Sequence, residues 1–124
     1  MNYGISQLSI VPMRSETSDK SEMINQILFG EHFKILEERK KWSRIRLAHD
    51  SYEGWICNKQ LLKISEEDYQ QLDKDISTLT TDILDIISKD QHQPIVIGSI
   101  LPFYKSGHAN INDEMYEFNG LTTP

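Results

Sequence analysis

The sequence predicts a mainly β protein: a small barrel of short strands, a short helical segment, and part of a second β module. Two observations predict this fold class. Residues 42–47 alternate between apolar and polar side chains with a period of two, and residues 54–56 begin a similar strand after a polar turn, as expected for half-buried strands. Short apolar segments separated by polar turns also recur along the first 64 residues, and this pattern is typical of a small barrel.

The charge of the chain changes abruptly near Ser65, which predicts a boundary between modules. Residues 1–64 hold 10 Lys and Arg against 8 Asp and Glu, whereas residues 65–124 hold 3 against 11. We therefore predict a barrel over residues 1–64, a helical linker over 65–78 and a partial second module over 79–124. The acidic second part argues against nucleic acid as a partner of the whole chain, because phosphate binding needs clustered positive charge.

The first module should contain five or six short strands. They are expected at residues 8–11, 23–29, 32–37, 42–47, 54–56 and 61–64. Pro12 should end the first strand because it has no N–H to donate to a ladder. Residues 15–21 are polar and are expected to form a long exposed loop.

A short helix should follow at Ser65, which can cap it, with acidic residues in its first turn. Tyr69 and Leu72 lie three residues apart and could dock this helix on the barrel. The apolar residues within 76–87 could form one face of a helix. The Ile and Thr content of the same residues favours strands instead. Strands are expected at 94–98 and 115–118, with a hairpin turn at Asn119-Gly120. Only four residues remain after that turn, so the second module is expected to lack its end.

No side chain of the chain is predicted to be catalytic. Cys57 is the single cysteine, and it follows a strand rather than a helix start or a paired histidine, so we expect an inert thiol. The four histidines have no metal-ligand spacing, which predicts no metal site and no cofactor; they are His32, His49, His92 and His108.

A basic cluster and three aromatic residues are candidates for binding. The basic residues are Arg39, Lys40, Lys41, Arg44 and Arg46. They could contact an anionic partner, but Glu37 and Glu38 lie close enough in sequence to neutralise them, and we favour a solvated hairpin. Trp55 is expected in the core, Tyr52 beside a turn and exposed, and Trp42 either in the core or on a ligand face.

Several separated blocks resemble one family. They are Ile10-Val11-Pro12-Met13-Arg14, Ser21-Glu22-Met23, Ile27-Leu28-Phe29-Gly30-Glu31 and Tyr52-Glu53-Gly54-Trp55-Ile56. These blocks resemble the N-terminal region of NlpC/p60-family cysteine peptidases, in which bacterial Src-homology-3-like domains precede a papain-like catalytic domain. The resemblance implies a Src-homology-3-like barrel, followed by part of a second one over 79–124. It also implies a parent enzyme that cuts bacterial cell-wall peptides.

The family's catalytic Asp-Cys-Ser/Thr-Gly motif does not occur in this chain. The resemblance therefore implies a non-catalytic part that recognises substrate or targets a cell-wall peptidase, with a papain-like domain as its partner. It implies that Glu22 and Tyr52 hold the free amine of the stem peptide's L-alanine. Two alternatives stay open: an adaptor barrel that binds a protein, and a small barrel that binds nucleic acid. The N-terminus has neither a basic nor an apolar leader segment, so we expect either a cytoplasmic location or a chain from which a leader has been removed. No apolar run could span a membrane, and no membrane partner is expected.

Overall fold

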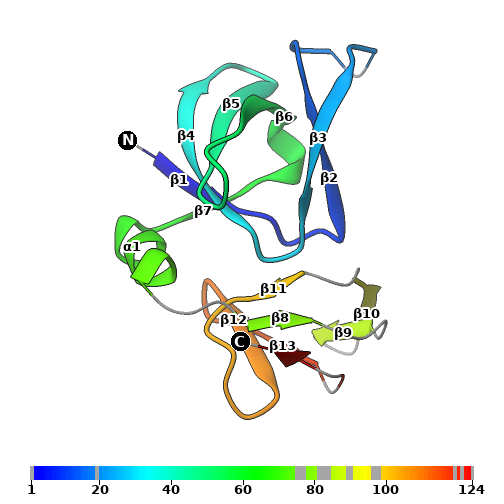
Figure 1. Ribbon diagram of the computed structural model, residues 1–124, viewed down its shortest axis with the longest axis vertical. Coiled ribbons are helices and arrows are strands. Elements are labelled where there is room, and N and C mark those ends of the chain that lie inside the picture. Colours follow the sequence, from blue (N-terminus) through cyan, green and yellow to red (C-terminus); the bar gives the residue numbers. More distant parts are fainter. Residues whose placement is uncertain are drawn as a thin grey trace.

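The computed structural model describes residues 2–18, 20–74, 78–80, 85–88, 91–95, 99–118, 120 and 122–123. Figure 1 shows one body formed by the first seven strands, with the remaining strands gathered below it and the helix at one side. The structure is mainly β, as predicted. Among the described residues no helix is both long and apolar enough to cross a membrane.

One antiparallel sheet of seven strands, in the order β3-β2-β6-β5-β4-β1-β7, curls into the first body. Its strands are β1 (Asn2–Ile5), β2 (Ile10–Arg14), β3 (Met23–Leu28), β4 (His32–Glu38), β5 (Trp42–Leu47), β6 (Glu53–Cys57) and β7 (Leu62–Ile64). A 3-10 helix, η1 (Asn58–Gln60), precedes β7. The alternation predicted for β5 is confirmed: Ser43, Ile45 and Leu47 are buried, whereas the residues between them are not.

Two expectations for the start of the chain were wrong. The first strand is β1, which pairs with both β4 and β7, although no strand was expected there. Pro12 does not end a strand but lies inside β2, opposite Gln26 of β3. On its other side β2 pairs with β6 only at Arg14, so at Pro12 that side of the ladder is open and the missing N–H costs no hydrogen bond.

The helix α1 (Glu66–Lys74) begins after Ser65 and ends close to the barrel. The Asp68 N–H donates to Oγ of Ser65 at 3.0 Å, which is the predicted cap. Tyr69 and Leu72 are 5% and 8% exposed, so the predicted docking face is confirmed. The ring of Tyr69 lies 4.4 Å from the ring of Tyr3 in β1, centroid to centroid.

Two smaller sheets follow. One has the strand order β10-β9-β13-β12 and the other β11-β8-β14. Their strands are β8 (Thr78–Thr80), β9 (Asp85–Ser88), β10 (Gln91–Pro94), β11 (Ile100–Leu101), β12 (His108–Ile111), β13 (Glu114–Glu117) and β14 (Thr122–Thr123).

The predicted strand at 115–118 corresponds to β13. Of the strand predicted at 94–98, Pro94 is the last residue of β10, and residues 96–98 lie outside the described part. Asn119 of the predicted hairpin turn also lies outside it. The last two described residues form β14, which pairs with β8.

The buried side chains form two clusters. The barrel interior is filled by Val11, Met13, Ile27, Phe33, Ile35, Ile45, Leu47 and Ile56. The second cluster joins both parts of the chain: Ile5, Phe29, Leu72, Ile95, Leu101, Ala109, Ile111, Tyr116 and Phe118. Because barrel, helix and second part contribute to this cluster, they share one hydrophobic core rather than meeting through a polar surface.

Candidate functional site

A row of side chains crosses the outer face of the barrel. The strand registers place Met23 opposite Arg14, Arg14 opposite Trp55, Trp55 opposite Arg44, and Arg44 opposite Glu37. We call these five residues the outer row. The strand positions on either side of Trp55 and of Arg44 are buried, so the alternation of each strand turns the outer row away from the core.

Trp55 lies in the outer row and not in the core, contrary to expectation. Its neighbours Gly54 and Ile56 are buried, and a period of two then requires Trp55 to face outward. The guanidinium of Arg39 lies 4.6 Å from its ring centroid, a cation–π contact that covers part of the ring. The alternation within residues 53–57 could have predicted this from sequence.

The predicted neutralisation of the basic hairpin by Glu37 and Glu38 is confirmed for Glu37 only. Glu38 pairs with Lys63 instead, and Glu53, which was not predicted, neutralises two of the arginines. Arg39 pairs with Glu37 at 2.7 Å. Arg44 and Arg46 pair with Glu53 at 3.1 and 2.8 Å. These carboxylates occupy the arginines that a phosphate backbone would need, so the hairpin presents a mixed-charge surface rather than a positive one.

Glu22 and Tyr52, the predicted substrate contacts, are both exposed at the edges of strands. Glu22 precedes β3, and its carbonyl accepts the Ser15 N–H at 3.0 Å. Tyr52 precedes β6, is 42% exposed, and its N–H donates to Oδ1 of Asp50 at 3.0 Å in a turn. Among the described residues no hydrogen bond joins these two side chains.

The segments that carry Glu22 and Tyr52 nevertheless meet. A Cβ built on Gly54 would lie 3.2 Å from Cδ1 of Ile24. Glu22 and Tyr52 are each two residues along the chain from this contact between β3 and β6. Trp42 lies apart from this contact, half-buried at the start of β5 and opposite Cys57.

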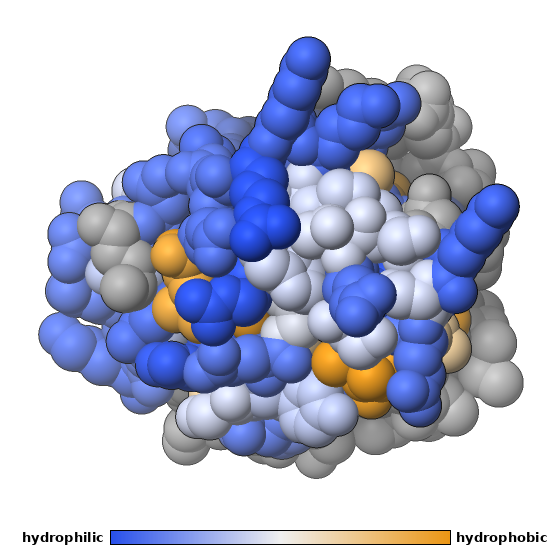
Figure 2. Space-filling view, turned by 90° about the horizontal axis from the view of Figure 1, so that it is seen from above, coloured by the Kyte–Doolittle hydropathy of each residue, from blue (hydrophilic) through white to orange (hydrophobic). Residues whose placement is uncertain are grey.

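The end of the barrel that carries the β2–β3 loop is mainly hydrophilic. Figure 2 shows this face, on which the hydrophobic side chains form small separate patches between polar ones. Long apolar grooves that would hold a hydrophobic helix are not visible on this face. Its surface chemistry suits a polar or charged ligand.

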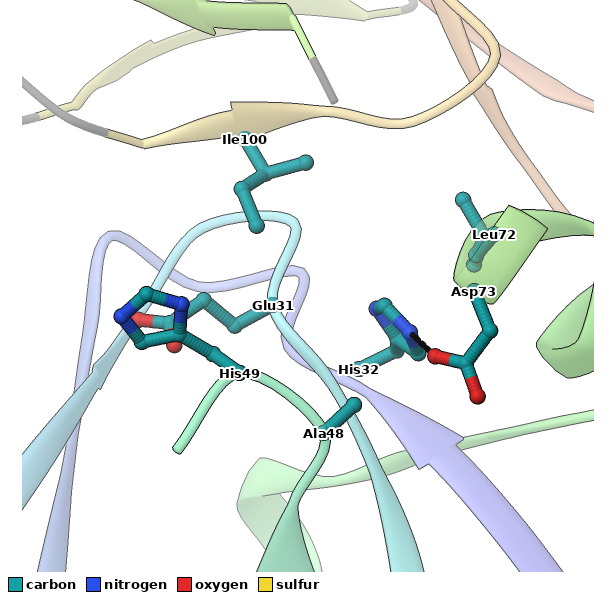
Figure 3. Close-up of a pocket in the computed structure, with 7 residues that line it drawn as sticks. All are labelled: Glu31, His32, Ala48, His49, Leu72, Asp73 and Ile100. Atoms are coloured by element: carbon teal, nitrogen blue, oxygen red, sulfur yellow. Dashed lines mark hydrogen bonds and ion pairs between the residues drawn. The ribbon is translucent and has the colours of Figure 1, made fainter. Parts of the chain in front are cut away.

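A small pocket of about 150 Å³ lies where barrel, helix and second part meet. Figure 3 shows Glu31 and His49 on one side, His32 and Asp73 on the other, and Ile100 of β11 across them. Nε2 of His32 donates to Oδ1 of Asp73 at 2.6 Å. Burial raises the pKa of the Glu31 carboxyl, against the lowering effect of the Leu28 N–H that it accepts.

Sequence reasoning did not find this pocket. Glu31, His32, His49 and Asp73 are spread over 42 positions of the chain, and no local spacing connects them. The pocket exists because the helix folds back onto β4, which only the tertiary structure shows. Within the described residues no three His, Cys, Asp or Glu side chains lie close enough to hold a metal ion.

Comparison with known proteins finds a family that the first part of the chain is similar to. Residues 13–61 match the profile of the bacterial dipeptidyl-peptidase Sh3 domain. This is the resemblance that the sequence blocks predicted. No curated protein matches the chain.

One solved structure shares the fold over nearly the whole chain. It is the crystal structure of an NlpC/P60 family protein from Bacillus cereus ATCC 10987, with a TM-score of 0.71 and 12% sequence identity. The match covers 98% of this chain and 55% of that chain. This chain therefore spans about half the length of the Bacillus protein, and the likeness concerns the fold alone.

Proposed function

We propose that this chain is the substrate-recognition or targeting part of an NlpC/P60-type cell-wall peptidase. The observation that carries the proposal is the Sh3 domain match over residues 13–61, supported by the fold likeness to about half of an NlpC/P60 family protein. In this proposal the second part of the chain, residues 79–124, is a second Src-homology-3-like module. The catalytic step belongs to a papain-like domain that acts with this chain.

The ligand in this proposal is a peptidoglycan stem peptide with a free N-terminal L-alanine. Glu22 offers an exposed carboxylate with no ion pair among the described residues, and Tyr52 offers a hydroxyl in the adjoining loop. An ammonium group between them would gain one charge-assisted and one neutral hydrogen bond. The hydrophilic surface at the end of the barrel that carries the β2–β3 loop suits such a ligand (Figure 2).

The test is binding of L-Ala-γ-D-Glu-diaminopimelate to the full chain, measured by NMR titration. Glu22→Gln should weaken binding by about ten- to a hundred-fold, because one charge-assisted contact is lost. Tyr52→Phe should cost less, since the ring stays. Acetylating the peptide's amine should weaken binding to the wild type and change little for Glu22→Gln.

Glu16 provides a matched control, because it is an exposed carboxylate in the same β2–β3 loop. Glu16→Gln should bind like the wild type. Equal binding by the Glu16 and Glu22 variants, with free and acetylated peptides alike, would refute the amine site. A nucleic acid probe tests the alternative of a nucleic-acid-binding barrel. If the chain binds this probe at low salt and the affinity collapses at moderate salt, that alternative is favoured.

A further inference from the structure

Arg14 differs from the other arginines of the described chain. Arg39, Arg44 and Arg46 each pair with a glutamate, whereas no described carboxylate pairs with Arg14. Its Nη1 donates to the backbone carbonyl of Ser21 at 3.3 Å. Its Nε is buried and has no hydrogen-bond partner.

A buried N–H without an acceptor is unusual in a folded protein, and such groups commonly mark a place where water or a ligand completes the structure. The residues opposite Arg14 on the neighbouring strands do not explain why a positive charge lies at this position of β2. Its outer-row neighbours are Met23 and Trp55, and neither carries a charge that would need neutralising. A guanidinium there is therefore left with unused donors in a partly desolvated position.

The nearest segment supplies the opposite charge. Arg14 reaches the carbonyl of Ser21, the residue next to Glu22. The strand register places Met23, the residue after Glu22, opposite Arg14. A cation and an anion, neither of them ion-paired within the described residues, therefore lie near each other on one hairpin. A ligand that carries both an ammonium and a carboxylate could satisfy the two groups at once.

We propose that Arg14 binds a carboxylate of the same peptide whose amine Glu22 holds; this inference rests on the proposed function. In a peptide linked through the γ-carboxyl of glutamate, the α-carboxylate is free and lies one residue from the alanine amine. Two extended residues span at most about 7 Å, a separation that suits neighbouring side chains of one hairpin. The planar guanidinium fork matches a carboxylate geometrically, as a lysine ammonium does not.

The test follows the Nε–H resonance of Arg14 by ¹⁵N NMR in the full chain, a signal that reports on the guanidinium itself. Three probes are titrated, each with the γ-carboxyl of glutamate blocked as a methylamide in place of the next peptide link: L-Ala-γ-D-Glu, the same dipeptide with its α-carboxylate amidated, and the dipeptide acetylated at its amine. We expect L-Ala-γ-D-Glu to shift the Arg14 signal together with the backbone signals of Glu22 and Tyr52. The amidated dipeptide should shift only the latter two, and it should bind about ten-fold more weakly.

The outcomes separate this inference from the proposed function. If L-Ala-γ-D-Glu moves the signals of Glu22 and Tyr52 but leaves the Arg14 signal fixed, the carboxylate site alone is overturned. An Arg14 signal that still moves with the acetylated dipeptide supports the carboxylate site even where amine capture fails. Signals that stay fixed with all three probes would overturn both proposals.

Variants give a second measurement. Arg14→Gln should make the wild-type preference for the free carboxylate over the amide disappear. Arg14→Lys should restore only part of it, because a lysine lacks the fork. Arg46→Gln is the matched control, since Arg46 already pairs with Glu53 at 2.8 Å, and it should leave the preference unchanged. A preference that survives Arg14→Gln would overturn the inference, and the probe comparison in wild type stands even where a variant folds poorly.

Discussion

At Gly30 the backbones of the two parts of the chain lie against each other. The φ of Gly30 is 84°, in the left-handed region that favours glycine. A Cβ on Gly30 would clash with the carbonyl oxygen of Ile100. Beside it, the Ile100 N–H donates to the carbonyl of Phe29 at 2.8 Å. Because of this backbone contact, the second part can sit against the barrel only where residue 30 has no side chain.

We predict that Gly30→Ala destabilises the protein by more than about 2 kcal/mol, since backbone strain and a clash with backbone add. The free energy of unfolding in urea would measure this. Gly107 has a φ of 83°, so Gly107→Ala serves as a control for the backbone cost at a glycine away from this contact. A Gly30→Ala variant no less stable than Gly107→Ala would show that the junction can open without cost.

At the scale of the element, α1 is held at both ends. Its N-terminus is capped by Ser65, whose Oγ accepts the Asp68 N–H at 3.0 Å. Near its C-terminus, Asp73 accepts the hydrogen bond from His32 of β4 at 2.6 Å. The ring of Tyr69 lies edge-on to the ring of His32, with 5.1 Å between centroids. A nine-residue helix is too short to be stable by itself, so these contacts fix it on the barrel.

We expect Ser65→Ala to lower the free energy of unfolding by about 1 kcal/mol, the usual cost of losing an N-cap. Ser65→Asp should keep most of the stability, because its carboxylate can accept the same N–H and favours the positive end of the helix dipole. Urea unfolding of the three proteins would decide this. Equal losses for Ala and Asp would mean that the cap contributes nothing and that Ser65 matters for another reason.

For the whole molecule, the shared core makes barrel, helix and second part depend on one another. Phe29 of the barrel and Tyr116 of the second part pack edge to face, with ring centroids 5.3 Å apart. Tyr69 and Tyr116 are each 5% exposed, and burial is the main cause that raises the pKa of each to about 12. Tyr116 of the shared core and Tyr69 of the docking face of α1 therefore link the stability of the fold to pH.

Stability should fall as the pH rises from about 10 to about 12. In that range the unfolded chain has released the phenolic protons while the folded chain keeps them, so unfolding is favoured as pH rises. Below pH 10 the full stability should be present. Urea unfolding at a series of pH values would measure the slope, and Tyr69→Phe should reduce it. A slope unchanged by Tyr69→Phe would contradict the assignment.

The sequence by itself determined the local elements that have strong local signals. The alternation in β5, the Ser65 cap and the docking face of Tyr69 and Leu72 were all predicted, because side-chain period and capping chemistry depend only on neighbouring residues. The blocks from Ile10 to Ile56 also determined the resemblance that the Sh3 domain match bears out.

The strand β1, the position of Pro12 within β2, and the pocket lined by Glu31, His32 and Asp73 depended on the tertiary structure. So did the unpaired state of Arg14. Each of these features depends on which strand or helix lies beside a residue, and such pairings join positions far apart in the chain. A short sequence window carries little information about them, since the free energy that fixes them comes from packing in the shared core.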